Sequence, residues 1–194
     1  MNQRGFTFSE LVVVISVFSI TLVATTDIFM RSQRIQRRTA ALERLQDDAR
    51  YIMSKISSEV RAGAIEYAFY PSGQIPADGS EELALINFEG KKLRFKASSE
   101  QCPDVQSTPC VLLSDDGGTS WGSATSKSIT VERLYFYITP LKDPFFLDEA
   151  TNEFTADQQP RVTVVLALSA IVKGQQEPAK TTLQTTISTR AYKR

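Results

Sequence analysis

Residues 4–17 read RGFTFSELVVVISV, and this stretch decides how the first third of the chain folds. A short polar leader ends at Gly5, and an apolar run of about twenty-five residues then extends from Phe6 to Met30, long enough as a helix to cross a hydrocarbon core of about 30 Å. Glu10 places an acid near the start of this run. An unpaired carboxylate is costly in apolar surroundings, so Glu10 is a candidate functional residue. The alternative is that Glu10 lies at the membrane interface and reaches water.

This string resembles the class III signal of type IV prepilins and type II secretion pseudopilins: a basic leader, Gly before the cleavage site, Phe after it and Glu four residues further on. The resemblance covers residues 4–24 strongly. It implies cleavage between Gly5 and Phe6 by a prepilin peptidase, N-methylation of Phe6, and a role for Glu10 in recruiting the next subunit. The implied partners are other pilin-like subunits, the peptidase and the inner membrane. The chemistry agrees, since the Phe6 ammonium and a neighbour's Glu10 carboxylate would neutralise one another.

Composition limits the other functions that the chain can have. The 194 residues carry no net charge, which gives no electrostatic argument for nucleic acid as a partner. The absence of histidine removes Ser-His-Asp and Cys-His catalysis and two-His zinc sites. No nucleotide-binding or hydrolase motif is present either. We therefore expect a structural protein with no catalytic residues, no cofactor and no metal, although acids such as Asp115 or Asp148 could still pair in space.

Two local features concern loops. Cys102 and Cys110 lie close together in a polar segment, and we expect a disulfide rather than free thiols, because an anchored domain facing an oxidising compartment tends to pair an isolated even set. Residues 115–118, DDGG, resemble part of a calcium loop but lack its alternating carboxylates and later Glu. We expect turn chemistry there, with calcium binding left open.

No proline or glycine occurs from Phe6 to Ala62, so one helix should run unbroken to Gly63, a good C-cap residue. Asp27 stands about where many major pilins, which this chain resembles, have a helix-bending proline. It is expected either to act functionally or to mark the end of the bilayer and pair with Arg31.

From Arg31 the helix pattern becomes amphipathic. Apolar residues recur at three- and four-residue steps and predict a stripe that packs on a sheet, in preference to a free coiled coil. The members of the stripe are Ile35, Leu42, Leu45, Ala49, Ile52, Ile56 and Val60.

The sequence gives two opposite indications of how the chain is oriented in the membrane. Four arginines follow the apolar run, against Arg4 and the amino terminus before it, so the positive-inside rule would place the C-terminal domain in the cytoplasm. The resemblance and the cysteine pair favour the opposite side. We therefore expect a single-pass protein of the bacterial inner membrane whose C-terminal domain lies outside the cytoplasm.

After Gly63 the pattern changes to short runs rich in β-branched and aromatic residues, which predict strands. Gly90-Lys91 predicts a tight hairpin, and the last two long strands should pair antiparallel. Residues 71–82, 98–109 and 140–160 are expected to be loops, with Phe145-Phe146 folded back onto the domain rather than contacting a partner. The predicted strands are 65–70, 83–89, 92–97, 111–114, 129–139, 161–172 and 181–192.

The expected fold class is therefore α+β, a long N-terminal helix packed on an antiparallel sheet. The expected divisions are a leader (1–5), a hydrophobic helix (6–30), its amphipathic continuation (31–62) and a β-rich globular domain (63–194). Residues 44–63, RLQDDARYIMSKISSEVRAG, also resemble the helix of minor pilins of the W type and minor pseudopilins of the J type. The expected function is a structural, minor subunit of a type IV pilus or type II secretion pseudopilus. The alternatives are a membrane-anchored binding or sensor domain that does not polymerise and, less favoured, a tethered hydrolase.

Overall fold

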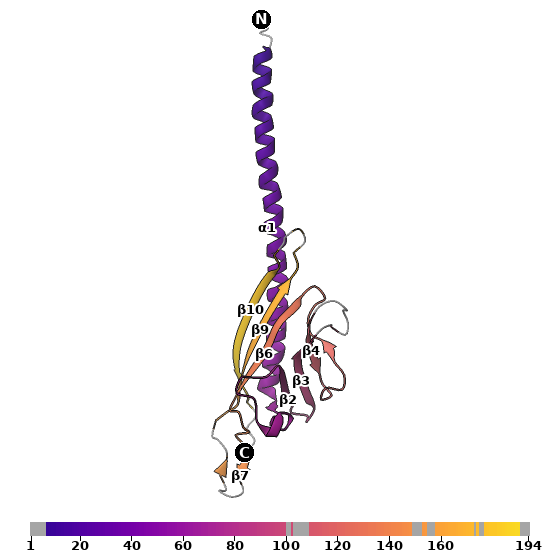
Figure 1. Cartoon of the computed structure of the whole chain (residues 1–194), viewed down its shortest axis with the longest axis vertical. Coiled ribbons are helices and arrows are strands. Elements are labelled where there is room, and N and C mark those ends of the chain that lie inside the picture. Colours follow the sequence, from indigo (N-terminus) through magenta and orange to yellow (C-terminus); the bar gives the residue numbers. More distant parts are fainter. Residues whose placement is uncertain are drawn as a thin grey trace.

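The computed structural model describes residues 7–99, 102, 109–148, 153–154, 158–172, 174 and 177–190. One long helix is followed by antiparallel strands, some short and some long, and by two 3-10 turns (Figure 1). The elements are α1 (Phe8–Ala62), β1 (Ala64–Ile65), η1 (Tyr67–Phe69), η2 (Pro71–Gly73), β2 (Glu82–Ile86), β3 (Lys92–Ala97), β4 (Val111–Ser114), β5 (Gly122–Ser123), β6 (Thr130–Thr139), β7 (Leu147–Asp148), β8 (Glu153–Phe154), β9 (Arg161–Ala170) and β10 (Ala179–Ser188).

Helix α1 runs for 55 residues without a break, as the absence of proline and glycine predicts. Gly63 ends it as the expected C-cap, and its N–H donates to the Glu59 carbonyl at 2.8 Å. The backbone of Gly63 is extended rather than left-handed, so positive φ is not the reason for glycine. A Cβ at Gly63 would lie 2.8 Å from the Ile86 carbonyl oxygen and 2.9 Å from that of Glu59. Glycine is therefore required by the close approach of the chain to β2.

The second half of α1 packs on a three-stranded antiparallel sheet of order β10-β9-β6, while the first half projects alone beyond the domain (Figure 1). The sheet covers the predicted stripe, and five of its members are buried: Leu45, Ala49, Ile52, Ile56 and Val60. Leu42 is partly buried. The prediction was wrong for Ile35, which is 66% exposed because it lies beyond the end of the sheet.

A second antiparallel sheet has the order β1-β2-β3-β4-β5, and the predicted hairpin at Gly90-Lys91 joins β2 to β3. The long strands β9 and β10 pair antiparallel from Arg161–Ser188 to Ala170–Ala179, as expected. The prediction of a strand over 65–70 was wrong. Only Ala64–Ile65 pairs with β2, and the chain then turns through η1. In the segment expected to be the third loop, β7 and β8 form a small hairpin.

The main core lies between α1 and the two sheets, with Phe95 and Phe136 among its largest buried side chains. The expected fold class is confirmed: one long N-terminal helix followed by antiparallel sheets in an α+β, pilin-like arrangement. The consequence for function is that the domain organises only half of α1. The other half presents its side chains to the surroundings.

Candidate functional site

The candidate site is the N-terminal half of α1. Gly5 and Phe6 lie outside the described residues, so the site is seen from Thr7 onward. Thr7 is the N-cap, with its hydroxyl oxygen 3.4 Å from the backbone N–H of Glu10. This places Glu10 in the first helical turn, where a carboxylate is favoured by the positive end of the helix dipole.

The apolar side chains of this half are exposed all round the helix. Every residue from Phe8 to Met30 is exposed, among them large side chains such as Phe18, Ile20 and Val23. This helix is long and apolar enough to cross a membrane. An apolar surface of this size is not left in water, so it requires lipid or other protein around it.

The hydroxyl groups in this half are satisfied within the helix itself. Beyond the first turn, each hydroxyl donates to a backbone carbonyl three or four residues earlier, at 2.6–3.0 Å, as in Ser16 to Val12 and Thr21 to Val17. The residues concerned are Ser16, Ser19, Thr21, Thr25 and Thr26. Their hydroxyl groups therefore need no hydrogen-bond partner from the lipid or protein that surrounds the helix.

The two acids of this half differ in their partners. Asp27 pairs with Arg31 at 2.9 Å, one turn further on, as one of the two sequence alternatives predicted. Glu10 forms no ion pair with any residue that the structure describes. After the hydroxyls and Asp27 are accounted for, the Glu10 carboxylate is left without an ion-pair partner among the described residues.

A family model described as the prokaryotic N-terminal methylation motif matches residues 1–26. The chain carries a type IV prepilin-like signal. The match spans Gly5, Phe6 and Glu10, and it ends one residue before Asp27, so the methylation motif and the exposed half of α1 are nearly the same segment. Searches of curated proteins and of solved structures found no match.

Away from the methylation motif, Cys102 and Cys110 form the expected disulfide, with their Cα atoms 5.5 Å apart. Both cysteines are buried and pack with Leu112 and Trp121 in a small cluster separate from the main core. The bridge therefore belongs to the packing around Leu112 of β4 and not to the packing of α1.

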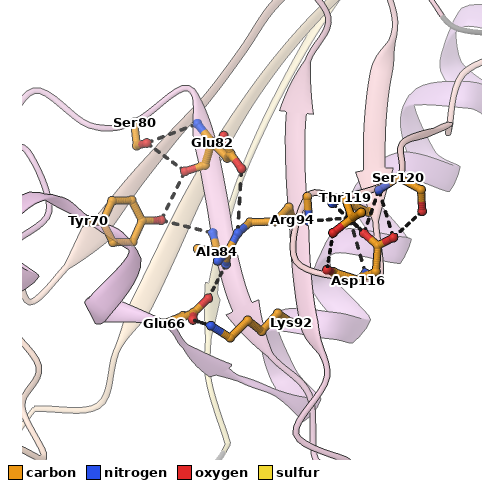
Figure 2. A network of polar contacts seen from close by, with 12 residues as sticks. Glu66, Tyr70, Ser80, Glu82, Ala84, Lys92, Arg94, Asp116, Thr119 and Ser120 are labelled. Atoms are coloured by element: carbon orange, nitrogen blue, oxygen red, sulfur yellow. Dashed lines mark hydrogen bonds and ion pairs between the residues drawn. The ribbon is translucent and has the colours of Figure 1, made fainter.

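The DDGG segment, residues 115–118, forms a turn that hydrogen bonds to the Asp116 side chain stabilise. The Asp116 carboxylate accepts hydrogen bonds from the Ser120 hydroxyl and N–H, the Ser114 hydroxyl and the Thr119 N–H (Figure 2). These bonds, that of the Ser120 hydroxyl first, hold the pKa of Asp116 well below its ordinary range. Its oxygens are thus occupied within the loop, in agreement with the expectation of turn chemistry. Among the described residues, no group of three or more potential metal ligands occurs.

The domain contains one charged network that sequence reasoning missed. The Arg94 guanidinium and the Glu66 carboxylate, 5% and 7% exposed, lie 2.5 Å apart, and Lys92 Nζ lies 2.8 Å from the other Glu66 oxygen (Figure 2). Arg94 also lies 3.9 Å from Glu82 and 4.1 Å from the centre of the Phe69 ring. Burial by itself raises the pKa of Glu66, but hydrogen bonds from Lys92 and Arg94 lower it below its ordinary value overall.

Tyr70 closes this network from the side of the 3-10 turns. Its hydroxyl accepts from the Ala84 N–H and donates to the Glu82 carbonyl, each at 3.2 Å (Figure 2). Burial, opposed by the bond from Ala84, raises the pKa of the Tyr70 phenol to about 12. Because these groups are paired with one another, we interpret the network as structural.

The hint in the sequence was the alternation of β3, in which Arg94 falls between the core residues Leu93 and Phe95. Alternation assigns Arg94 to the outer face of the sheet but does not reveal that η1 covers that face. Phe146, expected to fold back onto the domain, is 64% exposed and lines an open hollow of about 530 Å³ with Tyr67 and Lys142 of the domain. Phe145, its neighbour, is half-buried.

Proposed function

We propose that this chain is a structural subunit of a type IV pilus or type II secretion pseudopilus, assembled through the N-terminal half of α1. The observation that carries the proposal is the methylation motif on a helix half that its own domain leaves bare. A pilin-like subunit has two environments for such a surface, the bilayer before assembly and the helices of other subunits afterwards. In this proposal the leader is residues 1–5, the hydrophobic helix 6–30, its amphipathic continuation 31–62 and the globular domain 63–194.

Glu10 supplies the chemistry of recruitment in this proposal. Cleavage after Gly5 would create a new ammonium on Phe6, which the peptidase then methylates. In a filament, the Glu10 carboxylate of one subunit pairs with the Phe6 ammonium of the next, since neither charge is stable alone among apolar helices. Among the described residues Glu10 has no ion-pair partner, which supports this role, whereas Asp27 already pairs with Arg31.

The test is co-purification of the full chain, expressed with the other pilin-like subunits of its host. Glu10→Gln should leave membrane insertion and the fold of the domain intact but abolish incorporation, because breaking a buried pair costs about 3–5 kcal/mol at each contact. Asp27→Asn is the matched control, an acid of the same helix half that should remain dispensable. Normal incorporation of Glu10→Gln would count against the pairing, and wild type that associates with no pilin-like subunit would favour an anchored domain that does not polymerise.

Processing provides an independent check. The mature protein should lack residues 1–5 and carry one methyl group on Phe6, as measured by mass spectrometry of the N-terminal peptide. Gly5→Asp should block both changes, because it places a side chain where the peptidase accepts none. An intact Met1 in a host that has the peptidase would overturn the assignment.

Two finer points belong to the same proposal. The sequence of residues 44–63 supports a minor subunit of the W or J type, and the disulfide supports a domain outside the cytoplasm, because disulfides persist in oxidising compartments. Alkylation of the membrane-bound protein tests the location. Thiols at Cys102 and Cys110 that react without prior reduction would place the domain in the cytoplasm.

A further inference from the structure

Four arginines follow directly on the apolar half of α1: Arg31, Arg34, Arg37 and Arg38. No aspartate or glutamate occurs from Ile28 to Leu42, and Asp27 pairs with Arg31, so the segment carries a net positive charge. All four side chains are exposed. The charge is therefore local and strong even though the whole chain is neutral.

These arginines share one side of the helix. At about 100° per residue they fall within an arc of roughly 120°, the same side that carries Leu45 and Ala49 further along. We call this surface the arginine face. Helical side chains lean towards the N-terminus, so the guanidinium groups reach back towards the apolar half. From Arg31 to Arg38 the axis advances only about 10 Å, comparable to the headgroup layer on one side of a bilayer.

The turn between β9 and β10 lies at the same height along α1 as the arginine face. The turn between β9 and β10 approaches the arginine face, because a Cβ at Gly174 would lie 3.9 Å from a guanidinium nitrogen of Arg37. Ile171, at the start of this turn, is 84% exposed, and Ile35 on the helix is exposed as well. The end of the domain nearest the apolar half of α1 thus presents arginines together with isolated apolar side chains, a combination suited to a membrane surface.

We propose that the arginine face binds the phosphate headgroups of anionic phospholipids and so sets the depth at which the subunit rests in the bilayer. This inference rests on the membrane insertion contained in the proposed function. Guanidinium groups bind phosphate oxygens in a bidentate manner, and a helix that leaves the hydrocarbon core at Met30 delivers these four directly to the phosphate layer. It also accounts for the arginines that contradict the positive-inside rule: they are headgroup ligands, whichever side the domain occupies.

A second copy of this chain is the competing occupant, and the charges disfavour it. The acids of α1 beyond Leu42 are in part already engaged: Asp48 accepts from the Ser126 N–H at 3.0 Å, and Glu59 pairs with Lys55 at 2.8 Å. To pair with the arginines of a second copy, these acids would have to leave their present partners. Lipid phosphates can bind the arginine face without any such rearrangement. They lie where the apolar half ends.

The test uses the full chain, purified in a mild non-ionic detergent and titrated with phosphatidylglycerol or phosphatidylcholine, with bound lipid counted by native mass spectrometry. We expect wild type to retain phosphatidylglycerol in preference to phosphatidylcholine. Arg37→Gln/Arg38→Gln should weaken that binding by about five- to thirtyfold, since each arginine near a membrane surface contributes roughly fivefold. Arg44→Gln/Arg50→Gln, which removes two exposed arginines further along the same helix, should bind as wild type.

Equal binding of both lipids, unchanged binding by Arg37→Gln/Arg38→Gln, or an equal loss in Arg44→Gln/Arg50→Gln would overturn the inference. A dimer that forms without lipid and is lost only in Arg37→Gln/Arg38→Gln would assign the arginine face to a second copy instead. Alkaline carbonate washing of membranes separates the two proposals. Protein that stays in the membrane but lacks lipid preference refutes only the arginine face, whereas wild type that washes off refutes the membrane insertion on which both rest.

Discussion

The two halves of α1 are one continuous helix with opposite environments. From Leu45 to Val60 its apolar stripe is covered by the β10-β9-β6 sheet, and charged residues occupy the outer side. From Phe8 to Met30 the apolar residues surround the helix and nothing in the described chain covers them. The first pattern is satisfied by folding alone. The second is satisfied only by lipid or by other proteins, which is why the proposed function is assigned to that half.

Truncating a buried stripe residue should give the largest difference between the halves. Ile56→Ala removes a fully buried side chain and should lower the free energy of unfolding of the domain by about 4 kcal/mol, because the packed sheet cannot collapse around the cavity. Ile20→Ala, the same change in the exposed half, should leave domain unfolding unchanged. Thermal melts of the full chain in detergent measure both, and equal melting temperatures would contradict the division.

The second largest loss of stability should come from breaking the buried ion pair of the domain. Glu66→Gln leaves the buried Arg94 without its closest partner and should cost about 3 kcal/mol, at the lower end for buried pairs because Glu82 lies nearby. The folded pKa of Glu66 is lowered, so its contribution is present above the ordinary carboxylate pKa and is lost as pH falls through the folded value. The acid limb of a melting-temperature profile should therefore flatten in Glu66→Gln. A profile parallel to that of wild type would argue against the pair.

The junction between α1 and the sheets should tolerate an added methyl group less than the short strand β5 does. Gly63→Ala adds a methyl group less than 3 Å from two carbonyl oxygens and should destabilise the domain by about 1–2 kcal/mol. Gly122→Ala, where the nearest atom would lie 3.9 Å away, is the matched control and should be close to neutral. Urea titration of both variants checks this. Equal midpoints would mean that the chain relaxes at Gly63.

The smallest effect should come from the exposed pair at the end of the apolar half. Asp27→Asn removes a solvent-exposed pair with Arg31 and should change stability by less than about 0.5 kcal/mol. The same titration measures it. A loss as large as that of Glu66→Gln would show that this segment is packed rather than free.

The sequence predicted the parts of the fold that depend on local pattern. The uninterrupted helix, its end at Gly63, the hairpin at Gly90-Lys91 and the final strand pair follow from proline and glycine placement and from periodicity. Ile35 was misassigned because helical periodicity does not show where the sheet on the other side ends. The prediction over 65–70 failed because β-propensity does not register that this segment pairs briefly and then folds over Arg94.

Some residues of the candidate site and of the domain could be predicted from the sequence, and others could not. Gly5, Phe6 and Glu10 came from a motif, and the motif match covers them, but their roles in cleavage, methylation and recruitment remain a proposal. The disulfide was predictable because only two cysteines were available to pair. The buried network of Glu66, Arg94 and Glu82 was not, since its members come from three separate segments that only the fold brings together.

The most direct test of the account is photo-crosslinking in the native host, with a benzophenone amino acid placed at Ile20 in the exposed half of α1. We predict that Ile20 crosslinks to other pilin-like subunits, and that the same probe at Phe88, an equally accessible site on the β2–β3 turn, does so far less. Adducts of Ile20 with lipid alone, in cells that produce the other pilin-like subunits, would contradict the claim that this half of α1 is completed by neighbouring subunits.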